Sequence, residues 1–330
     1  MPALTVLEYV RDPDGVWTLP PALLADLRRR FPDIAFVSPR DRAAADAALP
    51  DADVVLGYAV RPHNFATARR LRWIQITAAG VGPALFPELV ASDVVLTNGR
   101  GLFSEAMAEH ALGMMLAFAR RLHLARDLQH ERRWGHVALR DEAPGFATLE
   151  GSMLGIVGFG SIGEALALRA RGFGMRVIGL RRTPRTPPDP ADAQWPVERL
   201  HGLLEVSDWV VLAAPLTGDT RDMIGAAEIA RMGPHAVLVN LGRGGLVDED
   251  ALIAALGQGR IGGAALDVFR EEPLPEASPL WAMPNVIVSP HVSGLGPGLW
   301  ERAMALFARN LSAFIEGRLL ENVVDKQAGY

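Results

Sequence analysis

The chain has 330 residues, hydrophobic side chains at 49% of its positions and a formal net charge of −5. Chains longer than about 250 residues usually divide into domains, so we expect two. The acidic balance and the lack of long basic runs argue against a nucleic-acid partner. Because the sequence contains no cysteine, disulfides, thiolate metal sites and cysteine nucleophiles are excluded. The first residues lack the pattern of a secretory signal, and no apolar run approaches the ~18 residues of a membrane span, which predicts a soluble, cytoplasmic protein.

Short apolar runs alternate with stretches of helical character along the first hundred residues. The runs lie at 3–9, 53–56, 73–76 and 94–97, and the helical stretches at 19–30 and 40–49. This alternation predicts strands and helices in a parallel α/β layer. The first part ends near Asn98-Gly99, and one of its connections, Ala78–Gly82, contains glycines.

Ser104 is a candidate N-cap for one long helix that runs from Glu105 to Gln129. The first half of this helix, 107–118, is apolar almost all round, which is typical of a helix buried on several sides. Two interpretations stay open: a domain-spanning or subunit-interface helix, or a plain core helix.

The segment Met153–Arg182 carries the most informative pattern in the chain. It reads as a buried strand, a glycine turn (Gly158, Gly160 and Gly163), a helix and a second strand. This context makes a GxGxxG pattern a signal for a dinucleotide site. One glycine forms the turn, the next lets the backbone approach a pyrophosphate, and the third lets helix and strand pack closely. The N-terminus of the helix offers free N–H groups to the anion.

The rest of the chain continues the alternation. The proline-rich stretch 183–190 predicts a loop after the second strand. Further strands are predicted at 208–214, 236–240, 263–268 and 286–289, with helices at 197–205, 226–232, 249–256 and 299–316. Together they predict a doubly wound sheet of about six strands.

Ligands of open α/β sheets lie beyond the carboxyl ends of the strands. The residues directly after each predicted strand of this second sheet are therefore candidates for the site. In chain order these residues are Gly158–Gly163, then Arg181 and Arg182, then Ala214, Pro215 and Thr220, then Gly242-Arg243-Gly244, then Asp267 and Glu272, and finally His291. An arginine, one or two carboxylates and a histidine thus converge at one edge. The glycines beside Arg243 predict a close approach there. We assign no chemistry to the other seven of the eight histidines.

Several runs, which together cover roughly residues 71–294, resemble the D-isomer-specific 2-hydroxyacid dehydrogenases. This family includes glyoxylate/hydroxypyruvate reductases and D-lactate and phosphoglycerate dehydrogenases. The runs are AEHALGMMLAFAR, GIVGFGSIGEALA, PLTGDTRDMI, AVLVNLGRGGLVDEDAL, GAALDVFREEPLP, SPLW and VIVSPHVSG. The resemblance implies reduction of a small 2-keto acid, of the glyoxylate or hydroxypyruvate type, to the D-2-hydroxy acid by a nicotinamide cofactor.

The resemblance also implies roles for particular residues. His291 would be the acid/base, Glu272 would orient it and favour its charged form, and Arg243 would hold the substrate carboxylate with a bidentate fork. The implied substrate contacts are Ala79, Gly80, Arg243 and His291. The implied cofactor contacts are Gly158, Gly160, Ser161, Ile162, Gly163, Arg181, Arg182, Ala214, Pro215, Thr220, Leu241, Gly242, Arg243, Asp267 (at the nicotinamide end), His291 and Ser293. No metal site is expected.

The implied fold is α/β, with two Rossmann-like doubly wound domains. A cofactor domain, 100–293, would be inserted into a discontinuous, flavodoxin-like substrate domain formed by 1–99 and 294–330. The active site would lie in the cleft between the domains. The resemblance further implies a homodimer formed through the cofactor domain, with the helix that matches Glu105–Arg120 at the interface.

Two departures from the family pattern bear on specificity. NAD-selective sites place an acid at the end of the second strand, where this chain has Arg181 and Arg182. An arginine pair suits a 2′-phosphate, so we predict a preference for NADP(H), with NAD(H) also possible. Phosphoglycerate dehydrogenases tend to have an arginine just after the strand at 53–56. Here Arg61 is slightly displaced from that place, which disfavours phosphoglycerate.

Two other kinds of protein remain as alternatives. The first is a cofactor-sensing protein, such as a corepressor, that keeps the same three side chains without physiological turnover. The second is a phosphite or formate dehydrogenase, although formate enzymes usually place a glutamine where Glu272 stands.

Overall fold

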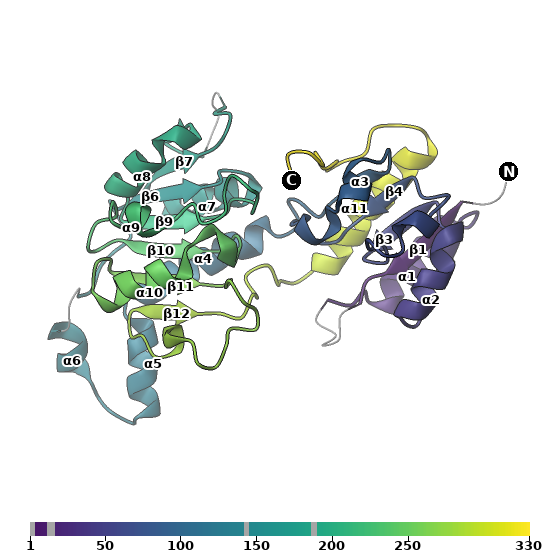
Figure 1. Ribbon diagram of the computed structural model, residues 1–330. Coiled ribbons are helices and arrows are strands. Elements are labelled where there is room, and N and C mark those ends of the chain that lie inside the picture. Colours follow the sequence, from purple (N-terminus) through teal and green to yellow (C-terminus); the bar gives the residue numbers. More distant parts are fainter. Residues whose placement is uncertain (1–3, 12–16, 142–144, 186–189) are drawn as a thin grey trace. The chain divides into compact units, whose positions relative to one another are not determined.

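The structure is a computed structural model that describes residues 4–11, 17–141, 145–185 and 190–330. The chain divides into two compact units (Figure 1). Unit 1 combines Met1–Phe103 with Gly296–Tyr330, and unit 2 is the continuous segment Ser104–Leu295. The assignment of these parts as substrate and cofactor domains stays a prediction. Among the described residues, no helix has the length and apolar character needed to cross a membrane.

Unit 1 is built on a parallel five-stranded sheet. Its strands are β1 (Thr5–Tyr9), β2 (Ala35–Val37), β3 (Val54–Gly57), β4 (Trp73–Gln75) and β5 (Val95–Thr97), in the order β2-β1-β3-β4-β5. This 2-1-3-4-5 order is that of the flavodoxin-like fold and confirms the predicted class. The sequence did not predict β2, a three-residue edge strand whose outer residues Ala35 and Val37 are exposed.

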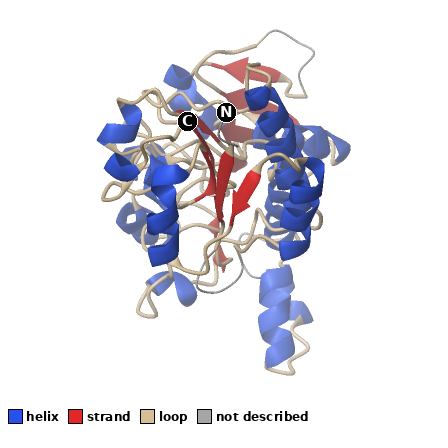
Figure 2. Cartoon of the chain, turned by 90° about the vertical axis from the view of Figure 1, so that its right-hand side faces the viewer, coloured by secondary structure: helices blue, strands red, loops and turns tan. Residues whose placement is uncertain are grey.

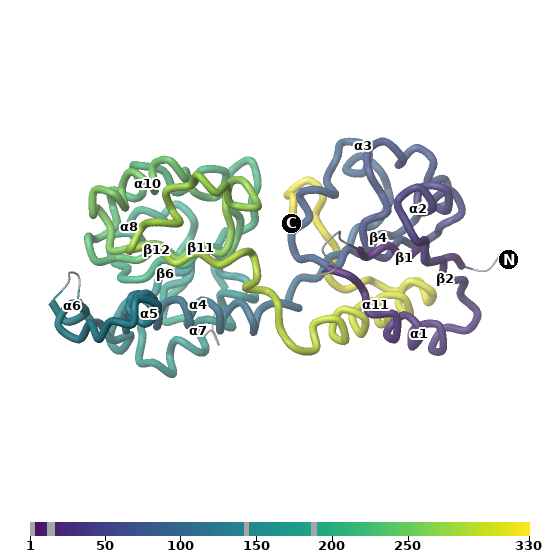
Figure 3. The backbone as a smooth tube through the Cα atoms, turned by 90° about the horizontal axis from the view of Figure 1, so that it is seen from below, coloured from purple at the N-terminus to yellow at the C-terminus, as the bar shows by residue number. Residues whose placement is uncertain are grey.

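Helices cover both faces of this sheet (Figure 2). They are α1 (Pro21–Arg30), α2 (Arg42–Ala48), α3 (Pro87–Val90) and α11 (Leu299–Ile315). Neighbouring strand residues face opposite cores: Trp73 packs with α1 and α11, and Ile74 packs with α2 and α3. Trp73 stacks on Phe307 of α11 at a ring distance of 5.3 Å. Through this contact α11, which runs beside α1 (Figure 3), completes the core of unit 1.

Unit 2 contains a parallel seven-stranded sheet. The strands are β6 (Met153–Val157), β7 (Arg176–Leu180), β8 (Ala193–Trp195), β9 (Trp209–Leu212), β10 (Val237–Asn240), β11 (Gly263–Leu266) and β12 (Val286–Val288), in the order β12-β11-β10-β9-β6-β7-β8. The order reverses between β6 and β9, which makes the edge beyond these two strands the switch point of a Rossmann-like fold. The prediction of about six strands missed β8, a short edge strand that pairs only with β7.

Helices also lie on both faces of the second sheet. One face is covered by α4 (Ser104–Ala119) and α7 (Ser161–Gly172), and the other by α8 (Leu200–Val206), α9 (Ala226–Ile229) and α10 (Glu249–Gly257). Ala108, Ala111 and Met115 of α4 have no exposed surface. These residues therefore belong to the core of unit 2, and a role of the remaining α4 surface in a subunit interface stays a prediction.

The single long helix predicted for residues 105–129 is wrong. The chain leaves α4 at Ala119 and starts again as α5 (Leu122–His130), followed by α6 (His136–Asp141). Arg121 between them adopts a left-handed conformation with φ = 54°. Its guanidinium donates to the carbonyl of Leu139 at 2.6 Å, so a tertiary contact holds the break. The predicted cap is also wrong, because the Ser104 hydroxyl is buried without a hydrogen-bond partner among the residues that the structure describes. In the predicted proline-rich loop, residues 186–189 lie outside the described residues.

Candidate active site

The glycine turn after β6 has the local geometry that a dinucleotide needs. Gly158 has φ = 89°, and a Cβ there would overlap the backbone of Ala214. A Cβ on Gly163 would press on Phe159 and Ile156, so this glycine allows α7 to pack on the sheet. Apart from its neighbours along the chain, no heavy atom of the described residues lies within 4 Å of the place where a Cβ on Gly160 would stand. Gly160 directly precedes α7, so a ligand can approach the backbone there closely. It can then accept hydrogen bonds from the N–H groups of the first helical turn, at Ser161 and Ile162. These residues fit a pyrophosphate.

His291 and Glu272 form a direct pair beyond the carboxyl ends of β11 and β12. The imidazole Nδ1 lies 2.6 Å from Glu272 Oε2, while Oε1 of the same carboxylate accepts the N–H of Phe269 at 3.0 Å. The His291 side chain is 48% exposed, so its other face is open to a ligand. With Nδ1 taken by the carboxylate, Nε2 is the nitrogen available for a proton transfer.

Two opposing influences act on Glu272. Partial burial raises the pKa of its carboxyl, but hydrogen bonds from His291 and from Phe269, and the charges of His291 and Arg243, together hold the pKa below its ordinary value of 4.5. The carboxylate is therefore ionised at neutral pH and accepts a hydrogen bond from the imidazole.

Arg243 follows β10 at the same edge. Asn240 donates from Nδ2 to the Arg243 carbonyl at 3.0 Å, and the guanidinium donates from Nη1 to the Gly242 carbonyl at 2.6 Å. Burial lowers the pKa of Arg243, and the charge of Glu272 acts against that shift. The flanking glycines allow a close approach of protein backbone: a Cβ on Gly244 would overlap Phe269, and one on Gly242 would press on Ala214.

The structure gives Asp267 a role that the sequence did not indicate. This side chain has no exposed surface, and its two carboxylate oxygens accept hydrogen bonds from Ser289, Val292 and Ser293. The predicted contact with the nicotinamide end of a cofactor gains no support from this burial. Instead, Asp267 fixes the loop that carries His291.

The other predicted cofactor residues after the strands are either buried or part of a turn. Ala214 and Leu241 are buried, and the Ser293 side chain is also buried beside Asp267. Thr220 accepts the N–H of Thr217 at 2.8 Å and donates to the Pro215 carbonyl at 2.7 Å, which shapes the turn after β9. For these residues, contact with a cofactor stays a prediction.

Arg181 and Arg182 follow β7 as predicted. The Arg181 side chain is 18% exposed, and its Nη1 lies 3.8 Å from Glu164 of α7. Sequence reasoning missed Arg185, which lies 3.5 Å from the same carboxylate and is 68% exposed. No sequence pattern marks an arginine in a loop as a site residue. Arg185 is identified as a third cation only by its distance to Glu164 in the structure.

In unit 1, the predicted substrate residues Ala79 and Gly80 lie in the loop after β4. Tyr58 holds the start of this loop, because its hydroxyl accepts the Ala78 N–H at 3.1 Å. Asn98 holds the Ala79 carbonyl at 2.7 Å. Within the described part of the chain, the N–H groups of Ala79 and Gly80 have no acceptor.

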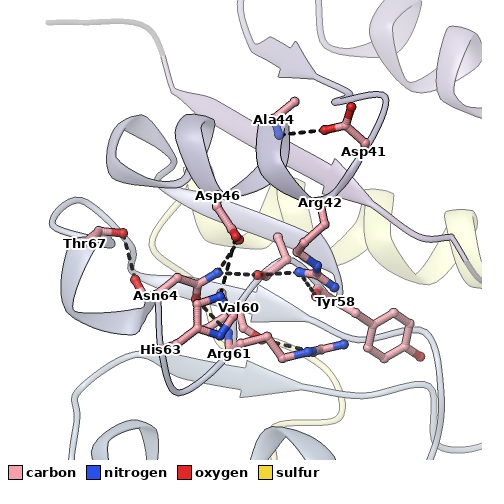
Figure 4. Close-up of polar contacts among 11 residues, drawn as sticks. Asp41, Arg42, Ala44, Asp46, Tyr58, Val60, Arg61, His63, Asn64 and Thr67 are labelled. Carbon is pink, nitrogen blue, oxygen red and sulfur yellow. Dashed lines mark hydrogen bonds and ion pairs between the residues drawn. The ribbon is translucent and has the colours of Figure 1, made fainter.

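Arg61 lies in the turn after β3, where its N–H donates to Asn64 at 2.8 Å (Figure 4). Arg42, which sequence reasoning missed, donates from Nη1 to the carbonyls of Tyr58 and Ala59 at 3.0 Å each. Burial lowers the pKa of Arg61, and the charge of Arg42 lowers it further. The end of β3 thus carries two guanidinium groups where the sequence prediction considered one.

Comparison with known proteins places this geometry in a family. The model of the D-isomer specific 2-hydroxyacid dehydrogenase, NAD binding domain, matches residues 112–293. A glyoxylate reductase from Thermococcus gammatolerans is 39% identical over 80% of this chain and 79% of its own length. A D-3-phosphoglycerate dehydrogenase from Methanocaldococcus jannaschii is 34% identical over 84% of this chain, but over only 52% of its own length.

A solved structure from Sinorhizobium meliloti, described as an NADPH-dependent glyoxylate/hydroxypyruvate reductase in complex with NADP and sulfate, superposes with a TM-score of 0.83. It is 27% identical and covers 99% of this chain and 100% of its own. These relatives lend no support to a cofactor-sensing protein or to a phosphite or formate dehydrogenase. Given the matched residues and the shared fold, the chain belongs to the D-isomer specific 2-hydroxyacid dehydrogenase family.

Proposed function

We propose that this chain reduces glyoxylate or hydroxypyruvate to the D-2-hydroxy acid and that His291 supplies the proton. The observation that carries this proposal is the 2.6 Å contact between His291 and the ionised Glu272, at the edge where Arg243 also lies. The glyoxylate reductases among the relatives support the choice of substrate.

The residues have separate tasks in this reaction. A reduced nicotinamide, when bound, would supply the hydride for the keto carbon. His291 gives the proton on Nε2 to the keto oxygen, and Glu272 stabilises the imidazolium until that transfer. Arg243 holds the substrate carboxylate through two parallel N–H donors. Gly160, Ser161 and Ile162 would hold the pyrophosphate of the cofactor.

The cofactor we propose is NADP(H). Three cations, Arg181, Arg182 and Arg185, follow β7 at the place where NAD-selective sites carry an acid for the ribose 2′-hydroxyl. Guanidinium groups match the charge and geometry of a 2′-phosphate. The relative from Sinorhizobium meliloti, solved with NADP, is consistent with this choice.

The deciding experiment follows absorbance loss of NADPH and of NADH with a panel of 2-keto acids. The panel holds glyoxylate, hydroxypyruvate, pyruvate, phenylpyruvate and 2-ketoisocaproate. It also holds 3-phosphohydroxypyruvate, because Arg42 and Arg61 place positive charge after β3. We expect turnover of glyoxylate or hydroxypyruvate by the wild type and none by His291→Gln, which still binds NADPH. Undiminished turnover by His291→Gln would remove His291 from the mechanism.

A further inference from the structure

We propose that His110 of α4 is a positioning residue, which holds the loop of His291 in place through Ser289 and Asp267. The proposal rests on the catalytic role proposed for His291. The three residues form a continuous chain of hydrogen bonds that starts on a helix, passes the end of β12 and reaches the backbone on the C-terminal side of His291.

The carboxylate of Asp267 lies at the centre of these hydrogen bonds. Oδ1 accepts the Ser289 hydroxyl at 2.6 Å and the Val292 N–H at 2.9 Å, and Oδ2 accepts the Ser293 N–H at 3.0 Å. A carboxylate without exposed surface needs such donors to compensate for its lost hydration. Asp267 therefore binds the two residues directly after His291.

The backbone of His291 itself needs this support. It adopts a left-handed conformation with φ = 53°, which residues with a Cβ rarely adopt. Its N–H donates to the carbonyls of Asp267 at 2.9 Å and Ser289 at 3.1 Å. Such a conformation persists only where the surrounding contacts over-determine it. The network around Asp267 supplies these contacts.

His110 closes the network from the side of the helix. Its Nε2 lies 3.0 Å from Ser289 Oγ and 3.8 Å from Asp267 Oδ1. Asp267 Oδ1 accepts the one hydroxyl hydrogen of Ser289, so this hydrogen cannot also be donated to His110. The Ser289 oxygen then accepts from His110, which fixes the imidazole as the Nε2–H donor. His110 thus sets the orientation of the Ser289 hydroxyl, and through it the position of the Asp267 carboxylate.

Loss of these hydrogen bonds should lower kcat more than it weakens the binding of the cofactor. In His110→Phe, the Ser289 hydroxyl loses its donor, and in Ser289→Ala, Asp267 loses a hydrogen bond. In both variants the loop of His291 gains freedom, and the proton donor spends less time in the reactive geometry. We expect kcat to fall about tenfold, because small misplacements of reacting groups are costly. His110→Gln keeps a donor on a side chain and should restore most of the rate.

The test compares these three variants with His201→Gln, a control on an exposed histidine of α8. The measurements are kcat, KM for glyoxylate, the Kd of NADPH by fluorescence titration and the thermal midpoint. The proposal requires a fall in kcat for His110→Phe and Ser289→Ala, rescue by His110→Gln, and a Kd and thermal midpoint close to the control.

Three outcomes overturn it. If His110→Phe and Ser289→Ala keep the wild-type kcat while His291→Gln is inactive, the positioning role is wrong and the function of His291 stands. If kcat, Kd and thermal midpoint deteriorate together without rescue by His110→Gln, His110 is only structural. Turnover by His291→Gln would instead refute the catalytic role of His291, and the positioning role with it. If His110→Phe does not fold, the smaller change Ser289→Ala decides alone.

Discussion

At the scale of single residues, the charge of Glu272 links the candidate active site to stability. Its pKa lies below 4.5 in the folded chain, because the favourable contacts with His291, Phe269 and Arg243 outweigh burial. A carboxyl with a depressed pKa stabilises the fold above its unfolded-state pKa, and this contribution is lost as the pH falls through the folded-state value.

We therefore predict that Glu272→Gln is less stable than the wild type at pH 7. The gap should close as the pH falls from about 5 to below 4, since the wild-type carboxylate is then protonated. Denaturant titrations at a series of pH values measure it. A gap of constant size over this range would show that the ionised carboxylate does not contribute.

The arginines after β7 give a second prediction at this scale. Replacing both Arg181 and Arg182 with alanine should raise the KM for NADPH far more than the KM for NADH, because only NADPH carries the 2′-phosphate. Arg176→Ala is the matched control, since Arg176 is exposed and starts the same strand. Equal effects on the two cofactors would contradict the NADP(H) assignment.

The residues that sequence reasoning found at the site share one property: they lie just after strands. Arg243, Glu272 and His291 could be named because parallel strands bring their carboxyl ends to one edge. His110 could not be named in this way. It lies on α4, 179 positions before Ser289, and only the packing of that helix brings the two together.

At the scale of elements, a buried polar side chain adds to the apolar contacts between α11 and the first sheet. Asn310 donates from Nδ2 to Gln75 and to the Glu321 carbonyl, both at 3.1 Å, and accepts the Glu321 N–H at 2.7 Å. Asn310 is 1% exposed and Gln75 is 3% exposed, so their contact is shielded from water.

Asn310→Ala should therefore lower the free energy of unfolding by about 2 kcal/mol, because buried groups lose their hydrogen bonds. Urea denaturation measures the effect, and Ser312→Ala on the same helix is the control. The buried polar contacts of Asn310 would have little energetic weight if both variants showed the same stability.

The elements that sequence reasoning missed have physical reasons in common. Strands β2 and β8 have three residues each and pair with a single neighbour, so their order depends on that neighbour more than on their own sequence. The break before α5 lies at arginines, which are good helix formers. The contact of Arg121 with Leu139 decides it, and no local pattern contains that contact.

At the scale of the whole molecule, we propose a homodimer, and exposed apolar side chains point to a surface that follows the predicted interface helix in the sequence. One face of α4 belongs to the core of unit 2, and contact of its remaining surface with a partner stays a prediction. Large exposed apolar side chains occur at and after the start of α5, with exposed fractions of 55% at Leu122, 95% at Trp134 and 58% at Val137. Exposed apolar side chains gathered in one segment are typical of an interface.

Introducing charge there should separate the subunits. Light scattering of the wild type should give twice the chain mass of 35.5 kDa, and the double variant Leu122→Asp, Trp134→Asp should give the single mass. Leu319→Asp is the control, because Leu319 is 96% exposed but lies far along the sequence, after α11. A wild type of single mass at micromolar concentration would contradict the dimer.

Because unit 1 is discontinuous in the sequence, the two units fold in a defined order during translation. Unit 2 is one uninterrupted stretch and can acquire its fold while the rest is still being translated, since domains fold as units. The first sheet is synthesised earlier, but unit 1 is complete only after α11 has been synthesised. Until then Phe307 cannot pack on the ring of Trp73. The part made first is therefore finished last, and a nascent chain stalled before residue 299 exposes an apolar sheet face that chaperones recognise.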